Sequence, residues 1–265
     1  LYEKTESCVL VGDEKTAFFD VEVGVREGCV LSSTLFSIYI NSMVKEINQS
    51  GIGIEVLGRK IAILLYADDI VLIADSVEDL QRGMRIITKW GRKWQCRFNR
   101  GKSNVVDYGS RKETEAEWLL GGGEVDQVDS YKYLGMDIKG NLAWNKFKGG
   151  LIEKAKKNMI TVWAMGLRKG RLTVRAACNL WQALVRQILE YGAEALGEGK
   201  WEEAERLLRE MAKRITGLKQ STNNEVVLGE LGWWKLKSRR HMLTLTYWRR
   251  LINMEYERLP RMVYE

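Results

Sequence analysis

Two adjacent aspartates, Asp68 and Asp69, lie in the middle of a long apolar stretch at 61–74. The residues on both sides are of types that favour β-strands, so the Asp-Asp pair predicts the two-residue connection of a tight hairpin. Such a turn needs no function, because aspartate is common in turns for conformational reasons. Both arms, however, are apolar on both faces of the pleat, which predicts a hairpin packed into a core.

Two neighbouring carboxylates repel each other unless a positive charge compensates them. A hard divalent cation with oxygen ligands does so, and Mg²⁺ prefers one or two protein carboxylates together with substrate phosphates. The pair at Asp68 and Asp69 therefore favours a metal site over a plain exposed turn.

The elements expected around this hairpin make the first 140 residues a mixture of helices and short strands. A helix is predicted from about Ser32, because apolar residues recur there at the spacing of one helical face. These residues are Leu35, Tyr39, Met43 and Ile47. Short strands are expected at 18–25, 52–57, 105–108 and on both sides of Gly135.

A second helix is predicted to begin after Ser76, whose side chain can cap it, with Asp79 as the acidic partner three residues later. Its apolar stripe consists of Leu80, Met84, Ile87, Trp90 and Trp94. Its basic residues fall on the other faces, and they are Arg82, Arg85, Lys89, Arg92 and Lys93.

The chain changes character after Gly140 and becomes nearly all helical. Four amphipathic helices are predicted near 145–165, 173–191, 200–216 and 236–254. We therefore expect an α+β protein with a boundary at 140–144, dividing it into 1–140 and 141–265.

Charge is distributed unevenly along the chain, whose net charge is +7. Residues 1–75 hold 6 basic and 12 acidic residues, whereas 76–265 hold 36 and 23. The segment 82–112 contains ten basic residues against the single acid Asp107. A surface helix usually mixes both signs, so this segment predicts a polyanionic partner.

Several classes of protein are disfavoured by composition. The four cysteines are far apart and form no Cys-x-x-Cys pair, which disfavours a zinc ribbon or a disulfide framework. One histidine, His241, excludes a site with several histidine ligands and is expected to be structural. No run approaches 18 apolar residues, so we expect no membrane span.

Four motifs, in order, resemble those of reverse transcriptases from non-LTR (LINE-type) retrotransposons. The segment 66–69, Tyr-Ala-Asp-Asp, resembles the family's YADD box. Segment 19–32 resembles its Gly-Val-Arg-Gln-Gly-Cys-Val-Leu-Ser region, 98–103 its Phe-Asn-x-x-Lys-Ser/Thr motif, and 131–135 its Tyr-Lys-Tyr-Leu-Gly hairpin. Segments 188–192 and 231–234 are also similar to non-LTR elements, so the resemblance covers nearly the whole chain.

This resemblance implies an RNA-directed DNA polymerase, which extends a DNA primer on an RNA template with deoxynucleoside triphosphates. Residues 1–140 would be part of its palm, and 141–265 its helical thumb and C-terminal region. Asp68 and Asp69 would hold two Mg²⁺ ions, with Mn²⁺ as an alternative, and Lys102 would assist the leaving pyrophosphate. An intracellular protein of nucleus and cytoplasm, in a ribonucleoprotein, is implied as well.

The resemblance also implies binding residues. Contacts with the incoming nucleotide would come from Arg26, Glu27, Gly28, Tyr66 and Ala67. The primer grip would consist of Tyr133, Leu134 and Gly135. The nucleic-acid backbone would be bound by Lys154, Lys156 and Lys157, on the predicted helix 145–165.

Part of the family's pattern is missing. No aspartate matches the third metal ligand, which the family carries upstream of segment 19–32, and the fingers have no counterpart. Glu27 and Ser33 replace the usual Gln and Pro. We therefore expect weak or no polymerisation by this chain alone, the missing fingers and palm being another part of the same polyprotein.

Two other interpretations stay open. A catalytically silent nucleic-acid-binding fragment of a decayed element would keep the basic surface without the chemistry. An intron maturase relative would share the palm, but its helical C-terminal part matches less well.

Overall fold

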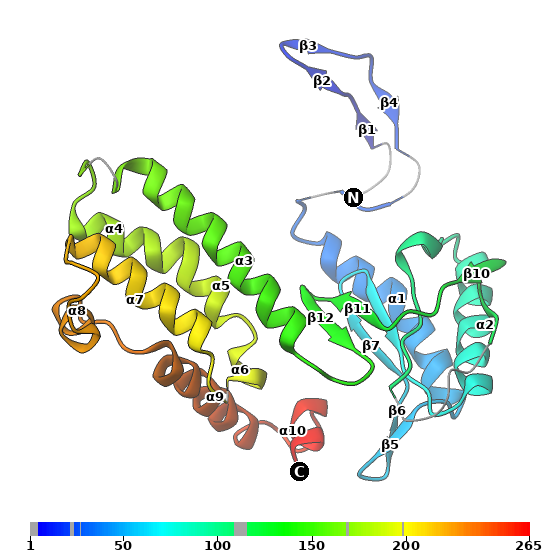
Figure 1. Cartoon of the computed structure of the whole chain (residues 1–265). Coiled ribbons are helices and arrows are strands. Elements are labelled where there is room, and N and C mark those ends of the chain that lie inside the picture. Colours follow the sequence, from blue (N-terminus) through cyan, green and yellow to red (C-terminus); the bar gives the residue numbers. More distant parts are fainter. Residues whose placement is uncertain (1–4, 22–23, 27, 109–115, 168–169, 198) are drawn as a thin grey trace. The chain divides into compact units, whose positions relative to one another are not determined.

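The structure is a computed structural model that describes residues 5–21, 24–26, 28–108, 116–167, 170–197 and 199–265 (Figure 1). The chain divides into two compact units. The first unit comprises Leu1–Val105 and Glu113–Asp126, and the second Val106–Lys112 and Gln127–Glu265. Both contain helices and small antiparallel sheets, so the predicted mixture of helix and strand is confirmed.

The N-terminal part of the first unit holds two short antiparallel pairs. β1 (Glu6–Ser7) pairs with β4 (Phe19–Asp20), and β2 (Leu10–Val11) pairs with β3 (Glu14–Lys15). The strand predicted at 18–25 is thus shorter than expected. Its aromatic residues are exposed and bury no apolar face that would extend the pairing.

Helix α1 (Ser32–Gln49) begins where the sequence predicts, but only the second half of its apolar stripe is buried. Ile40, Met43 and Ile47 lie in the core, whereas Leu35 is exposed. The first turns of α1 therefore extend past the core of the unit.

Helix α2 (Val77–Lys93) confirms its prediction closely. The hydroxyl of Ser76 accepts a hydrogen bond from the N–H of Asp79 at 3.2 Å, which caps the helix. Met84, Ile87 and Trp90 are buried, and Trp90 donates to the hydroxyl of Ser42 on α1 at 2.8 Å. The last residue of the predicted stripe, Trp94, follows the helix and is 43% exposed.

The first unit also contains three hairpins with two-residue loops. Their strands are β5 (Ile54–Val56) with β6 (Arg59–Ile61), β7 (Ile63–Tyr66) with β8 (Asp69–Leu72), and β9 (Trp118–Leu120) with β10 (Gly123–Val125). Turns of this length require positive φ angles, and Gly121 and Gly122 supply them in the last hairpin, at 61° and 86°. No strand forms at 105–108, where Val105 alone makes a bridge by donating to the carbonyl of Asp126.

The second unit consists of one hairpin and a set of packed helices. The hairpin is β11 (Ser130–Tyr133) with β12 (Met136–Lys139), on both sides of the loop at Gly135, as predicted. The helices are α3 (Asn145–Val162), α4 (Val174–Trp181), α5 (Gln187–Glu190), α6 (Ala193–Leu196), α7 (Glu202–Thr216), α8 (Asn224–Glu230), α9 (Leu236–Ile252) and α10 (Leu259–Tyr264).

All four predicted helices occur. The segment predicted as one helix at 173–191 is α4 and α5, joined by the π-helical turn η3 (Gln182–Arg186). The short helices α6, α8 and α10 were not expected, because fewer than two turns leave no visible apolar period. Among the described helices, none combines the length and the apolar composition that crossing a membrane requires.

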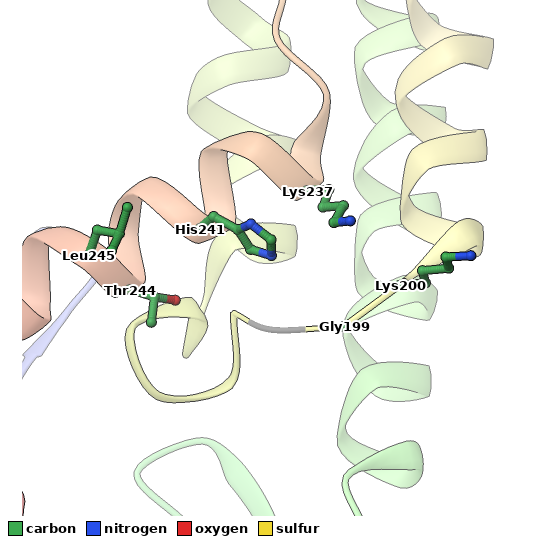
Figure 2. A pocket seen from close by; sticks show the side chains of 6 residues that line it. All are labelled: Gly199, Lys200, Lys237, His241, Thr244 and Leu245. Carbon is green, nitrogen blue, oxygen red and sulfur yellow. The ribbon is translucent and has the colours of Figure 1, made fainter.

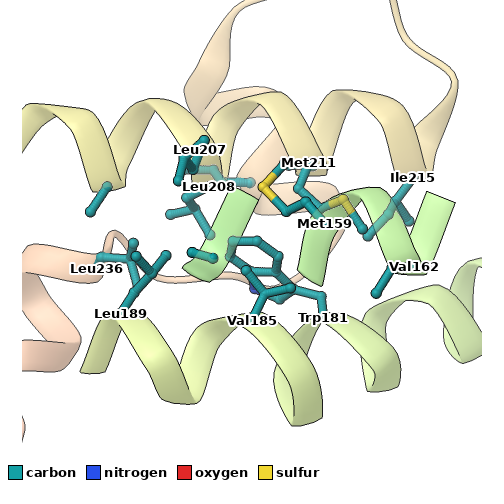
Figure 3. Packing of buried hydrophobic residues seen from close by; sticks show 14 of the residues in the cluster. Met159, Val162, Trp181, Val185, Leu189, Leu207, Leu208, Met211, Ile215 and Leu236 are labelled. Atoms are coloured by element: carbon teal, nitrogen blue, oxygen red, sulfur yellow. The ribbon is translucent and has the colours of Figure 1, made fainter. Parts of the chain in front are cut away.

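The core of the second unit lies between α3, α4–α5 and α7. Figure 3 shows Trp181, Val185 and Leu189 facing Leu208 and Met211 on α7. The indole of Trp181 also stacks on that of Trp233, with ring centroids 5.5 Å apart. Burial of this apolar surface is the main stabilising term of the unit.

The main division between the compact units lies between Asp126 and Gln127, so the β11–β12 hairpin is grouped with the helices. The division into 1–140 and 141–265 concerns palm and thumb, and it stays a prediction. β12 packs against α3, and the hairpin loop contacts Tyr191.

Candidate active site

The two aspartates lie at the end of the β7–β8 hairpin, but not as the sequence predicts. Tyr66 pairs with Asp69 in the ladder, so the two-residue connection is Ala67-Asp68 and not Asp68-Asp69. Ala67 adopts a φ of 52°, a left-handed conformation that the tight turn imposes on a residue with a side chain. Asp68 thus lies in the turn, and Asp69 is the first residue of β8.

One face of the hairpin packs against the core of the first unit, whereas the sequence predicts that both faces are packed. Ile63, Leu65, Ile70 and Leu72 pack against the core of the first unit. Leu64 and Val71 are cross-strand partners on the other face; they are partly buried too, but they do not pack against this core. Because facing pairs alternate between the two sides of a hairpin, Tyr66 and Asp69 share this open face.

The end of the hairpin is exposed. Tyr66 is 64% exposed, and Ala67, Asp68 and Asp69 are exposed as well. Within the described part of the chain, neither aspartate has an ion pair or a hydrogen-bond partner for its carboxylate. Two adjacent, uncompensated carboxylates form an anionic tip whose charge a cation would neutralise.

Their donor chemistry fits a hard divalent cation. Carboxylate oxygens are the ligands that Mg²⁺ prefers, and it completes its shell with water and substrate phosphate. The described residues contain no group of three or more His, Cys, Asp or Glu side chains that could hold a metal ion. Among the described residues, Asp68 and Asp69 are thus a pair of carboxylates that could hold a cation without a third acidic neighbour.

Lys102 lies on a separate element of the same unit. It ends the 3₁₀ turn η1 (Arg100–Lys102), and its N–H donates to the carbonyl of Asn99 at 3.1 Å. Its side chain is exposed, while Phe98, four residues earlier, packs against the core. The core thus anchors the motif 98–103 through its aromatic residue.

The loop before α1 carries two of the predicted nucleotide-binding residues. Gly28 adopts a φ of 77°, which only glycine tolerates easily. The carbonyl of Arg26 accepts hydrogen bonds from the hydroxyl of Ser32 at 2.6 Å and from the N–H of Cys29 at 3.3 Å. Glu27 lies outside the described residues.

The predicted primer-grip residues form the end of the β11–β12 hairpin, in the second unit. Tyr133 pairs with Met136, and Leu134 and Gly135 form the turn with φ angles of 47° and 81°. The phenol of Tyr191, which follows α5, donates to the carbonyl of Leu134. Segment 188–192 resembles non-LTR elements, but no local pattern in it predicts this contact.

The three predicted phosphate-binding lysines are exposed on α3, opposite its buried side. Lys156 forms an ion pair with Glu153 at 3.3 Å. Among the described residues, Lys154 and Lys157 have no ion pair. Two of the three charges are therefore available to an external anion.

His241, expected to be structural, lines a hollow of ≈ 360 Å³ in the second unit. Figure 2 shows it one turn from Lys237 on α9, with Lys200 on the segment before α7. The main-chain N–H of Lys237 donates to the carboxylate of Glu205 at 2.7 Å, which fixes the start of α9 against α7.

Comparison with known proteins decides the family. The family described as "Reverse transcriptase (RNA-dependent DNA polymerase)" matches residues 3–138, which is more than half of the chain. The chain belongs to the reverse transcriptase family. It is therefore classed with nucleotidyltransferases, and enzymes of this family generally use divalent metal ions.

Similar curated proteins indicate a reverse transcriptase of the non-LTR, LINE-type kind. The RNA-directed DNA polymerase from mobile element jockey of Drosophila melanogaster is 22% identical over 195 residues, which cover 71% of this chain and 21% of that protein. The Pol polyprotein from the type-1 retrotransposable element R2 of Popillia japonica is 23% identical over 228 residues, covering 82% and 36%. This reverse transcriptase chain thus spans about a fifth to a third of the length of these relatives.

The family match includes the hairpins β7–β8 and most of β11–β12, but it ends before α3. The matches to jockey and R2 cover more of the chain than the family match does.

Proposed function

We propose that this chain is part of an RNA-directed DNA polymerase that transfers deoxynucleotides to a primer 3′-hydroxyl. The observation that carries the proposal is the exposed, uncompensated pair Asp68 and Asp69 at a hairpin end, in a chain of the reverse transcriptase family. Two carboxylates of an incomplete set imply weak or no polymerisation by this chain alone.

Asp68 and Asp69 are the proposed ligands of Mg²⁺ or Mn²⁺. When bound, the metal supplies a positive charge that favours the alkoxide of the primer and neutralises the triphosphate. The carboxylate of Asp68 lies in the turn, and that of Asp69 lies on the open face beside Tyr66. In this proposal Tyr66 packs near the primer terminus. Lys102 donates a proton to the leaving pyrophosphate, or stabilises its charge.

The remaining residues bind substrates in this proposal. Arg26, Glu27 and Gly28 contact the incoming triphosphate from the loop before α1, together with Tyr66 and Ala67. Tyr133, Leu134 and Gly135 grip the primer. Lys154, Lys156 and Lys157 of α3 hold the phosphates of the RNA–DNA duplex, without sequence readout.

In this proposal the first unit and the β11–β12 hairpin form part of the polymerase palm. The helices that follow form the thumb and the C-terminal region. The third carboxylate comes from another part of the polyprotein, since the relatives are three to five times as long as the segment they share with this chain. The natural setting is a ribonucleoprotein of nucleus and cytoplasm, which localisation of the tagged protein would test.

Primer extension on an RNA template with Mg²⁺ tests the chemistry. The test variant is Asp68→Asn/Asp69→Asn. The control variant is Glu55→Gln/Asp75→Asn, which removes two other exposed acids of the same unit. In a longer protein that includes the preceding polyprotein region, we expect extension to fall at least about a thousandfold in the first variant only. Equal extension by both variants would reject the assignment of the two aspartates.

A catalytically silent nucleic-acid-binding fragment is the second candidate. It is favoured by the incomplete carboxylate set of the described residues and by the exposed charges of Lys154 and Lys157. Duplex binding by the chain and by the aspartate variant, without extension by either, would support this function. The names of the relatives, which are mobile elements, favour a retroelement over an intron maturase.

A further inference from the structure

An arginine-lined hollow of ≈ 540 Å³ lies in the first unit, at the C-terminal end of α2. Arg92, Arg97 and Arg100 line it, beside Gln95 and Cys96. None of its lining residues belongs to the β7–β8 hairpin, so it is separate from the candidate metal site. We call it the arginine hollow.

The hollow forms because the chain reverses at the end of α2. Gln95 adopts a φ of 55°, and the N–H of Cys96 donates to the carbonyl of Gly91 at 2.8 Å, which is a Schellman motif. A Cβ on Gly91 would lie 2.6 Å from the carbonyl oxygen of Cys96, so only glycine permits this reversal. The reversal places Arg97 and Arg100 around the same space as Arg92.

Two of the guanidinium groups lie over the turn between β9 and β10. A Cβ on Gly123 would lie 1.5 Å from Nη1 of Arg100, so this arginine occupies the space that a side chain would take. A Cβ on Gly122 would lie 3.8 Å from Nη2 of Arg92. Both arginines are exposed, and their guanidinium groups lie beside the glycine residues of this hairpin.

The charge of the hollow is uncompensated within the described residues. None of the ion pairs there involves Arg92, Arg97 or Arg100. Burial raises the pKa of the Cys96 thiol, so it adds no negative charge at neutral pH. The C-terminus of α2 contributes about half a negative charge, which explains one basic residue there but not three.

A basic stripe continues from the hollow along α2. Arg85 and Lys89 are exposed and precede Arg92 by seven and three residues, so the three share one side of the helix. The stripe is about 10 Å long at 1.5 Å per residue. One strand of a duplex carries a phosphate per about 3.4 Å of axis, and the phosphates of an extended single strand are farther apart, so the stripe and the hollow together have room for at least two phosphates.

We propose that the arginine hollow and this stripe bind the phosphate backbone of a single-stranded RNA. Arginine suits this ligand, because its planar fork binds phosphate oxygens in pairs. A strand fits better than a free nucleotide, because the positive charge extends beyond the hollow. The inference rests on the proposed function only in taking nucleic acid as the ligand.

Binding of a 5′-labelled, unstructured oligoribonucleotide to the full chain, followed by fluorescence anisotropy at several salt concentrations, tests the inference. The variant is Arg92→Gln/Arg97→Gln, which keeps Arg100 because that side chain packs on Gly123. We expect binding to weaken about tenfold at low salt. The slope of log K against log salt should fall by about 1.4, because each contact with a single strand contributes about 0.7.

A matched control separates a site from general charge. Lys45→Gln/Arg59→Gln removes two exposed basic residues of the same unit, outside the hollow and stripe. It should leave the affinity within about twofold and the slope unchanged. Equal weakening by both variants, or by neither, would overturn the proposal.

Two further arms identify the ligand and keep the two proposals apart. If equimolar inorganic phosphate or deoxynucleoside triphosphate displaced the RNA, the ligand of the hollow would be a small anion and not a strand, and the proposal would be overturned. Lys154→Gln/Lys157→Gln on α3 is measured in parallel. Weakening in that variant alone would reject the arginine hollow as the binding site of the single strand, whereas weakening in the arginine variant alone would support it. The proposed grip of α3 on the RNA–DNA duplex is tested separately, by duplex binding.

Discussion

The phenolic hydroxyl of Tyr191 donates a hydrogen bond to the main-chain carbonyl of Leu134, 57 residues earlier in the chain. Leu134 has a φ of 47°, an unfavourable conformation for a residue with a side chain. The Tyr191 ring also packs at 6.2 Å from that of Phe147 on α3. One tyrosine thus connects the hairpin end, which we assign to the primer grip, with the helices of the second unit.

Tyr191→Phe should lower the free energy of unfolding by about 1 kcal/mol, because it removes this hydrogen bond and keeps the ring. Tyr256→Phe, at a site 60% exposed, is the control and should change it by less than about 0.5 kcal/mol. Urea denaturation of both variants measures the difference. Equal stabilities would show that water replaces the Tyr191 hydroxyl at no cost.

Gly135→Ala should destabilise the hairpin by about 1–2 kcal/mol, since Gly135 has a φ of 81° and its Cβ would lie 3.4 Å from the Tyr191 oxygen. Gly150→Ala on α3 is the matched substitution, because a Cβ there meets nothing within 4 Å. It should stabilise the chain by about 0.5–1 kcal/mol, the gain in helix propensity. In thermal melts, the melting temperature should fall for Gly135→Ala and rise for Gly150→Ala. A shift of the same sign in both variants would contradict this prediction.

Asp68→Asn/Asp69→Asn should leave the free energy of unfolding without metal within about 0.5 kcal/mol of the parent chain, because neither carboxylate has a partner among the described residues. Mn²⁺ should broaden the amide NMR signals near Ala67 in the parent chain and not in the variant. A large loss of stability would show that the carboxylates have a structural role.

Arg240→Met should lower the free energy of unfolding by about 3 kcal/mol. Arg240 is 4% exposed, and its guanidinium donates to the carbonyls of Leu189 and Leu196, which the variant would leave unsatisfied. Burial lowers the pKa of this guanidinium, yet arginine remains charged at any physiological pH. Arg249→Met, exposed on the same helix, should be nearly neutral in the same denaturation experiment.

Local signals in the sequence predicted most of the elements. The cap at Ser76 and the stripe of α2 depend on residues three or four apart, and both were correct except at Trp94, which follows the helix and is exposed. The YADD turn was displaced by one residue, because cross-strand pairing and not aspartate's turn preference decides which residues form the loop. The strand expected at 105–108 did not form, since a strand needs a partner that the segment itself cannot supply.

The sequence by itself determined the family, through four motifs in order, and the position of the acidic pair at a hairpin end. Only the tertiary structure decided that the β11–β12 hairpin packs with the helices, that Tyr191 contacts Leu134, and that three arginines gather around one hollow. The physical reason is the range of the interactions. Periodicity and turn chemistry act between near neighbours, whereas these contacts depend on how glycine turns and helix ends bring distant segments together.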